Sequence, residues 1–143
     1  MIKANKTSMK LINTAEIYAI LAMVGGVFYR EFTKFNGFSG RTTLGFVHTH
    51  LFLLGMLFFL IAALFQFHVD LVSQKEFTLF YRIYNTGIAV AVAMLLCRGI
   101  AQVLGLELSK AVDASISGIA GIGHLGIGVG MILFFRLLKK NVV

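Results

Sequence analysis

Two histidines interrupt a long apolar stretch near the middle of the chain, and their side chains offer the clearest chemistry in the sequence. His48 and His50 lie in a run that continues to Phe67 without a charged side chain. Imidazoles bind metals and carry protons, and ionisable groups at membrane depth are rare and usually belong to a ligand site or a transport pathway. The His-x-His pair therefore marks the first candidate for a functional site.

The spacing of the pair limits how it can be used. Two residues along a regular α-helix correspond to a rotation of about 200°, so His48 and His50 face nearly opposite sides of their helix. They cannot both bind one metal ion from undistorted helical geometry. We expect two roles, in which one histidine faces a ligand while the other faces a neighbouring helix, a second metal ion or the membrane surface.

The composition is that of an integral membrane protein. The chain has 143 residues, 58% of them hydrophobic, and no proline; its mean hydropathy is +0.87. A membrane-crossing helix needs about 20 apolar residues. Four segments meet this requirement, and the short connections between them predict an all-α, up-down four-helix bundle. The expected spans of this single domain, residues 1–143, are about 11–29, 44–67, 86–108 and 116–138.

Basic residues are distributed unevenly between the two ends of the predicted bundle. The end with both termini holds Lys3, Lys6, Lys10, Lys75, Arg82, Arg136, Lys139 and Lys140. The other end holds Arg30, Lys34, Arg41 and Lys110. By the positive-inside rule, this bias predicts a multi-pass protein of the cell membrane with both termini in the cytoplasm. Because the basic residues sit at helix ends and form no continuous face, the net charge of +7 does not indicate nucleic-acid binding.

Other polar residues are expected at the depth of the histidine pair. Counted from the cytoplasmic ends of their spans, His50 and His124 differ in height by only about 4.5 Å at the α-helical rise. Arg98, on a span that runs in the opposite direction, is expected in the same layer. A buried arginine needs a counter-charge, which Glu31, Glu107, Asp113 or a bound anion such as a haem propionate could supply.

The fourth span is unusually rich in glycine. Six glycines occupy the thirteen positions from Gly118 to Gly130. The pairs Gly126-xxx-Gly130 and Ser117-xxx-Gly121 have the spacing of small residues that let membrane helices approach closely. The segment also contains a GxGxxG pattern, but no strand precedes it, so dinucleotide binding is not expected.

Glycine has a second potential role around the histidine of this span. Gly121 and Gly128 lie three positions before and four positions after His124, on the same helical face. Without side chains, that face is nearly flat. A flat surface beside a histidine would admit a planar macrocycle that larger side chains would exclude.

The motifs that are missing narrow the chemistry further. The sequence has no HExxH or CxxC motif, and no carboxylate triad is expected at the depth of the histidines. Both observations argue against a hydrolytic zinc centre. Two imidazoles from facing helices, with glycine and phenylalanine around them, suit haem b better. Copper or zinc bound by the three histidines would require a distorted second span. The candidate cofactor-binding residues are His48, His50, His124, Arg98, Gly121 and Gly128.

The segment from Phe46 to Gly55, FVHTHLFLLG, resembles the His-x-His helix in the catalytic subunit of haem-copper oxidases and nitric oxide reductases. The resemblance implies that His48 and His50 bind haem iron on opposite sides of the helix. That subunit contains three four-helix units, which implies a homo-oligomer here, with a trimer as the specific hypothesis. The copper-site histidine triad and the tyrosine cross-link motif are missing, so oxygen reduction is not expected.

Over its whole length, the chain resembles a bacterial domain-of-unknown-function family of small four-span membrane proteins. The shared motifs are His-Thr-His-Leu at His48–Leu51, Arg-Gly-Ile at Arg98–Ile100 and Gly-Ile-Gly-His at Gly121–His124. This resemblance implies the fold and the membrane location, and no activity. The leading hypothesis is haem-based electron transfer to a redox partner, or diatomic-gas binding. A scaffold or accessory subunit without a cofactor and a small transporter or proton relay are the alternatives.

Overall fold

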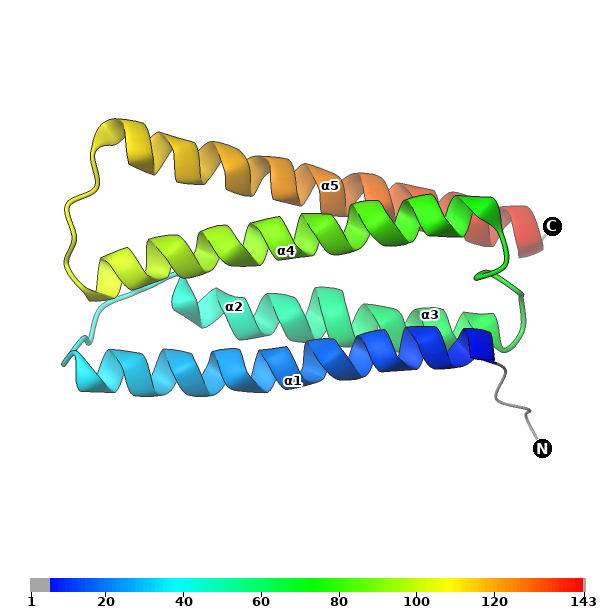
Figure 1. Ribbon diagram of the computed structural model, residues 1–143, viewed down its shortest axis with the longest axis horizontal. Coiled ribbons are helices and arrows are strands. Elements are labelled where there is room, and N and C mark those ends of the chain that lie inside the picture. The colour runs from blue at the N-terminus through cyan, green and yellow to red at the C-terminus, as the bar shows by residue number, and fades with distance from the viewer. Residues whose placement is uncertain (1–5, 143) are drawn as a thin grey trace.

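The computed structural model describes residues 6–142, and no strand occurs in that range. Its helices are α1 (Lys6–Phe35), α2 (Leu44–His50), η1 (Leu51–Leu57), α3 (Phe58–Gln66), α4 (Lys75–Val103) and α5 (Lys110–Val142). Because α2, η1 and α3 follow one another without a break, the six segments form four long helices (Figure 1). All four are long and apolar enough to cross a membrane. The expectation of an all-α chain with four helices of membrane-crossing length is therefore confirmed.

The helices alternate in direction along the bundle, as the short connections predict (Figure 1). We call the end that carries the connections 36–43 and 104–109 the histidine end. The opposite end, with connection 67–74 and the C-terminus of α5, is the terminal end. Lys3, which contributes to the charge bias, lies outside the described residues.

The third long helix differs most from its expected span of 86–108. α4 begins at Lys75, because polar residues continue the helix beyond its apolar part, and it ends at Val103. Gly105 follows with a φ of 63°, a left-handed conformation that favours glycine and ends helices. The peptide N–H of Leu106 donates to the carbonyl of Ala101, which closes the helix end. Residues in the last turns of α4 therefore lie closer to the histidine end of the bundle than the expected span implied.

An aromatic cluster fills the terminal half of the bundle. Its largest fully buried members, Phe59, Phe77, Phe80 and Tyr84, come from α3 and α4. Phe58 stacks on Tyr84 with ring centroids 4.4 Å apart and lies 5.0 Å from the ring of Phe134 on α5. Aromatic side chains bury large apolar areas, and paired rings add further stabilisation. This cluster joins α3, α4 and α5 away from the histidines.

Glycines allow the backbones of α4 and α5 to come into direct contact. A Cβ atom placed on Gly87 would lie 2.7 Å from the peptide nitrogen of Ile127 and 2.8 Å from the carbonyl oxygen of Gly123. A Cβ on Gly123 would lie 2.7 Å from the peptide nitrogen of Ala91. Side chains do not reach such distances, so this contact requires glycine.

The predicted packing role of the fourth span is confirmed for one glycine pair and is wrong for the other small-residue pair. A Cβ on Gly126 would lie 3.3 Å from the Cα of Gly87, and one on Gly130 would lie 2.8 Å from the side chain of Tyr84. Gly121 instead has open space where its Cβ would be. Gly121 lies on the free face of α5, and the packing helix meets a different face.

The second long helix contains a π-helical segment, η1, directly after the histidine pair. A Cβ on Gly55 would collide with the ring of Tyr18, so glycine lets α1 pack tightly against η1. From the other side, the hydroxyl of Tyr84 donates to the carbonyl oxygen of Leu54 at 2.9 Å. The distortion begins at Leu51, so both histidines remain on regular α2.

The glycine contact gives a direct test of the packing. We expect Gly87→Ala to destabilise the bundle by about 1–3 kcal/mol, the usual cost of overpacking, because the new methyl group would meet backbone atoms of α5. Gly118→Ala is the matched control, since open space surrounds that position on α5; it should be neutral or stabilising by up to about 1 kcal/mol. Thermal unfolding in detergent, followed by circular dichroism, measures both. Equal midpoints for the two variants would contradict the contact.

Candidate functional site

The structure brings His50 of α2 and His124 of α5 together. Their ring centroids are 5.8 Å apart, and the ring planes are nearly perpendicular at 87°. The prediction that these two residues lie at similar depth is therefore confirmed. Only these two of the three histidines in this half of the bundle meet.

Each of the two imidazoles is held by its own helix. Nδ1 of His50 lies 2.8 Å from the carbonyl oxygen of Phe46, and Nδ1 of His124 lies 2.8 Å from that of Ala120. A carbonyl oxygen only accepts, so Nδ1 is the donor in both contacts, and Nε2 takes no part in them. Metal-binding histidines are oriented in this way, with the second nitrogen donating to a carbonyl or carboxylate. Both rings are thus held in the orientation of metal-binding histidines.

The surface of α5 around His124 is open and apolar. Gly118, Gly121 and Gly128 have no atom within 4 Å of the position that a Cβ would take. These glycines and His124 line a shallow concavity of about 680 Å³. Its remaining lining residues are Ile122, Leu125, Val129 and Ile132. The predicted flat face around the histidine is present, and it points away from the contact with α4.

His48 lies on the other side of α2, as its spacing from His50 predicts. Its ring is nearly parallel to that of Tyr29 on α1, at an interplanar angle of 15° and a centroid distance of 6.3 Å. A Cβ on Gly26 would lie only 3.7 Å from the His48 ring, so α1 packs closely here. Nδ1 of His48 is buried and has no hydrogen-bond partner. His48 thus occupies an environment separate from that of His50 and His124.

The three histidines do not gather into one metal-binding group. Within residues 6–142, no three His, Cys, Asp or Glu side chains are arranged to hold a metal ion. The regular geometry of α2 keeps His48 turned toward α1, and the π distortion begins only after His50. The three-histidine site considered for copper or zinc is therefore not formed within this chain.

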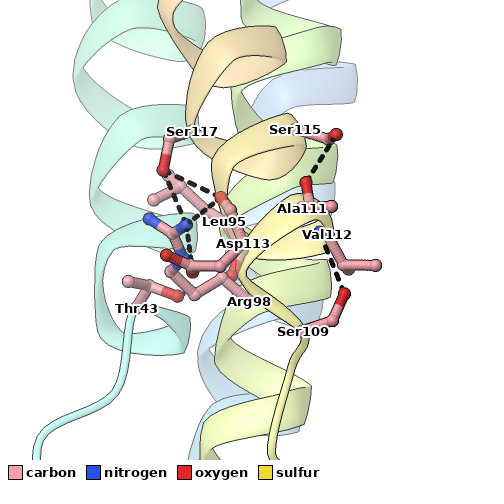
Figure 2. A network of polar contacts seen from close by, with 9 residues as sticks. All are labelled: Thr43, Leu95, Arg98, Ser109, Ala111, Val112, Asp113, Ser115 and Ser117. Atoms are coloured by element: carbon pink, nitrogen blue, oxygen red, sulfur yellow. Dashed lines mark hydrogen bonds and ion pairs between the residues drawn. The ribbon is translucent and has the colours of Figure 1, made fainter.

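Arg98 of α4 links to the beginning of α5 (Figure 2). Its Nη2 donates to the carboxylate of Asp113 at 2.7 Å, to the carbonyl oxygen of the same residue at 2.9 Å and to the hydroxyl of Ser117 at 2.8 Å. Asp113 is thus the counter-charge, one of the alternatives that the sequence left open.

The predicted depth of Arg98 is wrong. Its partner Ser117 lies seven residues before His124, which corresponds to about 10 Å along α5. Because α4 ends at Val103, Arg98 is only five residues from the helix end. It therefore lies nearer the connections of the histidine end than the histidine pair does. Its side chain is 27% exposed.

Sequence reasoning missed the polar contacts between α1 and α4. The hydroxyl of Tyr18 donates to Oδ1 of Asn85 at 2.6 Å, and the hydroxyls of Thr14 and Tyr81 are 2.7 Å apart. In each helix the two residues are four positions apart and share a face. That spacing is the sequence signal that could have found them. These contacts fix α1 against α4 in the half of the bundle opposite the histidines.

The family model described as "Protein of unknown function (DUF2871)" matches residues 9–141. The chain belongs to this family. The match covers all four membrane-length helices, in agreement with the likeness to a family of small four-span proteins. Comparisons with curated proteins and with solved structures give no match. The likeness of the second helix to the haem-copper oxidase subunit therefore gains no support from them.

The Arg98 contacts predict unequal effects of substitution. Arg98→Ala removes three hydrogen bonds and should destabilise the protein by about 1–3 kcal/mol. Asp113→Asn should cost about 0.5–1 kcal/mol, because the carboxylate is 58% exposed and the amide can still accept a hydrogen bond.

Urea or thermal unfolding of the detergent-solubilised protein measures these effects. Lys110→Gln, an exposed basic residue at the same end, is the matched control and should change stability by less than about 0.5 kcal/mol. An Arg98→Ala variant as stable as Lys110→Gln would show that the contacts contribute nothing.

Proposed function

We propose that this protein binds haem b between His50 and His124 and serves in electron transfer or diatomic-gas binding. The observation that carries the proposal is the pair of imidazoles 5.8 Å apart, each with Nδ1 held by its own backbone and Nε2 taking no part in that contact. Metal–imidazole bonds are about 2.0 Å long, so rings whose centroids are 5.8 Å apart are close enough for both imidazoles to reach one metal ion.

The number of protein ligands supports haem over a bare ion. A zinc site takes three or four protein ligands, and within residues 6–142 no cluster of three suitable side chains exists. Haem brings its own equatorial nitrogens and asks the protein only for axial ligands. Two neutral imidazoles from facing helices satisfy that need. His48 stands apart from this pair and is not needed for it.

The open face of α5 supports the same proposal. Gly121 and Gly128 leave space on both sides of His124 in which a planar macrocycle can lie against the helix. We assign Arg98 to the carboxylates of the macrocycle, because its hydrogen bonds in the described part of the chain all run through Nη2. Nε and Nη1 are left to bind an anion.

When bound, haem supplies reversible one-electron chemistry. The chain contributes two oriented imidazoles, whose Nδ1–H groups donate to carbonyl oxygens and so make Nε2 a stronger ligand. It also contributes apolar surroundings that limit access of water. Because His50 and His124 would both be engaged in holding the haem, the arrangement favours electron transfer, and gas binding would require one histidine to move away.

The environment and assembly are part of the proposal. The apolar helices indicate a lipid bilayer, and the charge bias supports termini in the cytoplasm and a histidine end at the outer side of the cell membrane. A homo-oligomer would cover the exposed face of α5; a trimer is the specific form that the oxidase likeness implies. A monomeric mass for the detergent-solubilised protein would remove the oligomer.

The ligand pair gives the central test. Protein purified with added haem should show a Soret band, which should be lost or strongly weakened in His50→Ala and in His124→Ala, because each removes one axial ligand. His68→Ala is the control, since this exposed histidine lies in the connection 67–74 at the terminal end; its band should match wild type. A folded wild-type protein that remains colourless with haem would overturn the proposal and leave the cofactor-free scaffold as the alternative.

A steric variant tests where the macrocycle lies. Gly121→Leu should abolish haem binding without unfolding the protein, because the new side chain fills open space and meets no protein atom within 4 Å at its Cβ. Ultraviolet-visible titration with haem measures binding, and circular dichroism measures folding. Unchanged haem affinity in this variant would place the macrocycle elsewhere.

A further inference from the structure

A second pocket lies at the histidine end, on the His48 side of α2. It has a volume of about 490 Å³ and is formed by residues of α1, α2, α4 and the connection 36–43. Its lining includes Tyr29, Arg41, His48 and Gln102, and no Asp or Glu. The haem proposal makes no use of this pocket.

Hydrogen-bond donors without partners converge on the pocket. The exposed guanidinium of Arg41 forms no ion pair among residues 6–142. Oε1 of Gln102 accepts from the peptide N–H of Thr43 at 2.8 Å, which leaves the amide nitrogen to donate. The His48 side chain also lines the pocket, and its Nδ1 is buried without a partner. The pocket therefore offers donors and positive charge, with no carboxylate to neutralise them.

The walls of the pocket are fixed before any ligand arrives. The hydroxyl of Thr42 donates to the carbonyl of Gly99 at 3.0 Å, and that of Thr43 donates to the carbonyl of Leu95 at 2.8 Å. Leu44 packs tightly against Gly99: a Cβ atom placed on Gly99 would lie 2.6 Å from the peptide nitrogen of Leu44. These contacts attach the connection 36–43 to α4. A preformed pocket binds without the cost of ordering a loop.

We propose that this pocket binds an anionic group, a phosphate or a carboxylate, with Arg41 as its charged anchor. Arg30, Lys34 and Arg41 occur together at this end, where lipid headgroups meet a membrane-spanning bundle. The group is therefore supplied by an acidic lipid headgroup or by a free anion. The neighbouring polar pocket is unsuited to this role, because the carboxylate of Asp113 lines it and its Arg98 is already assigned to the macrocycle.

The test compares anion binding by the wild-type protein and three variants of the full chain in neutral detergent. Thermal unfolding is followed as phosphatidylglycerol or inorganic phosphate is added, with phosphatidylcholine as the uncharged-lipid reference. Arg41→Gln should weaken the apparent affinity by about tenfold or more, as expected for loss of a charge-assisted hydrogen bond. Lys34→Gln is the matched control, because it also removes one positive charge from the histidine end, and Lys34 does not line the pocket.

The outcomes separate the sources and the alternatives. An Arg41-dependent response to both additives supports a free anion, and a response to phosphatidylglycerol alone supports a lipid headgroup. No saturable response, or equal weakening in Lys34→Gln, overturns the proposal. His48→Phe keeps a ring beside Tyr29 but removes both ring nitrogens, so it should weaken anion binding and leave the Soret band unchanged. That contrast distinguishes this pocket from the proposed haem site.

Discussion

The backbone contact between α4 and α5 is the constraint on which the rest of the arrangement depends. α5 packs mainly on α4, through glycines that no other residue could replace at that distance. The contact uses the face of α5 that carries Gly123 and Gly126, and it leaves the face with Gly121 and His124 free. It also sets the rotation of α5 at which His124 meets His50. One close approach thus determines both the packing and the location of the candidate site.

Three histidines in the same half of the bundle have different environments because of helix geometry. His50 and His124 donate from Nδ1 to carbonyl oxygens four residues earlier, and Nε2 takes no part in these contacts. His48, turned by about 200° on the same helix, stacks on Tyr29 and has a buried Nδ1 without a partner. The two faces of α2 therefore support different proposals, one for a metal-bound macrocycle and one for an anion.

Local sequence was sufficient for some of these features and insufficient for others. Span number and the opposite directions of His48 and His50 follow from apolar length and helical periodicity, and the open face around His124 follows from glycine spacing. The depth of Arg98 does not, because Gly105 ends α4 before the apolar stretch ends. The π segment does not follow either: its Gly55 packs against Tyr18 of α1, and this contact joins parts of the chain that are distant in sequence.

The π segment also sets the rotational register of the second helix. On one side of it, α2 directs His50 toward α5; on the other side, Phe58 and Phe59 enter the aromatic cluster. If Leu51–Leu57 became regular α-helix at unchanged length, the tighter turns would rotate one half of the helix by about 100° relative to the other. Either the histidine or the aromatic side chains could then keep their partners, but not both. The wide turns are thus constrained even where the individual leucines are exchangeable.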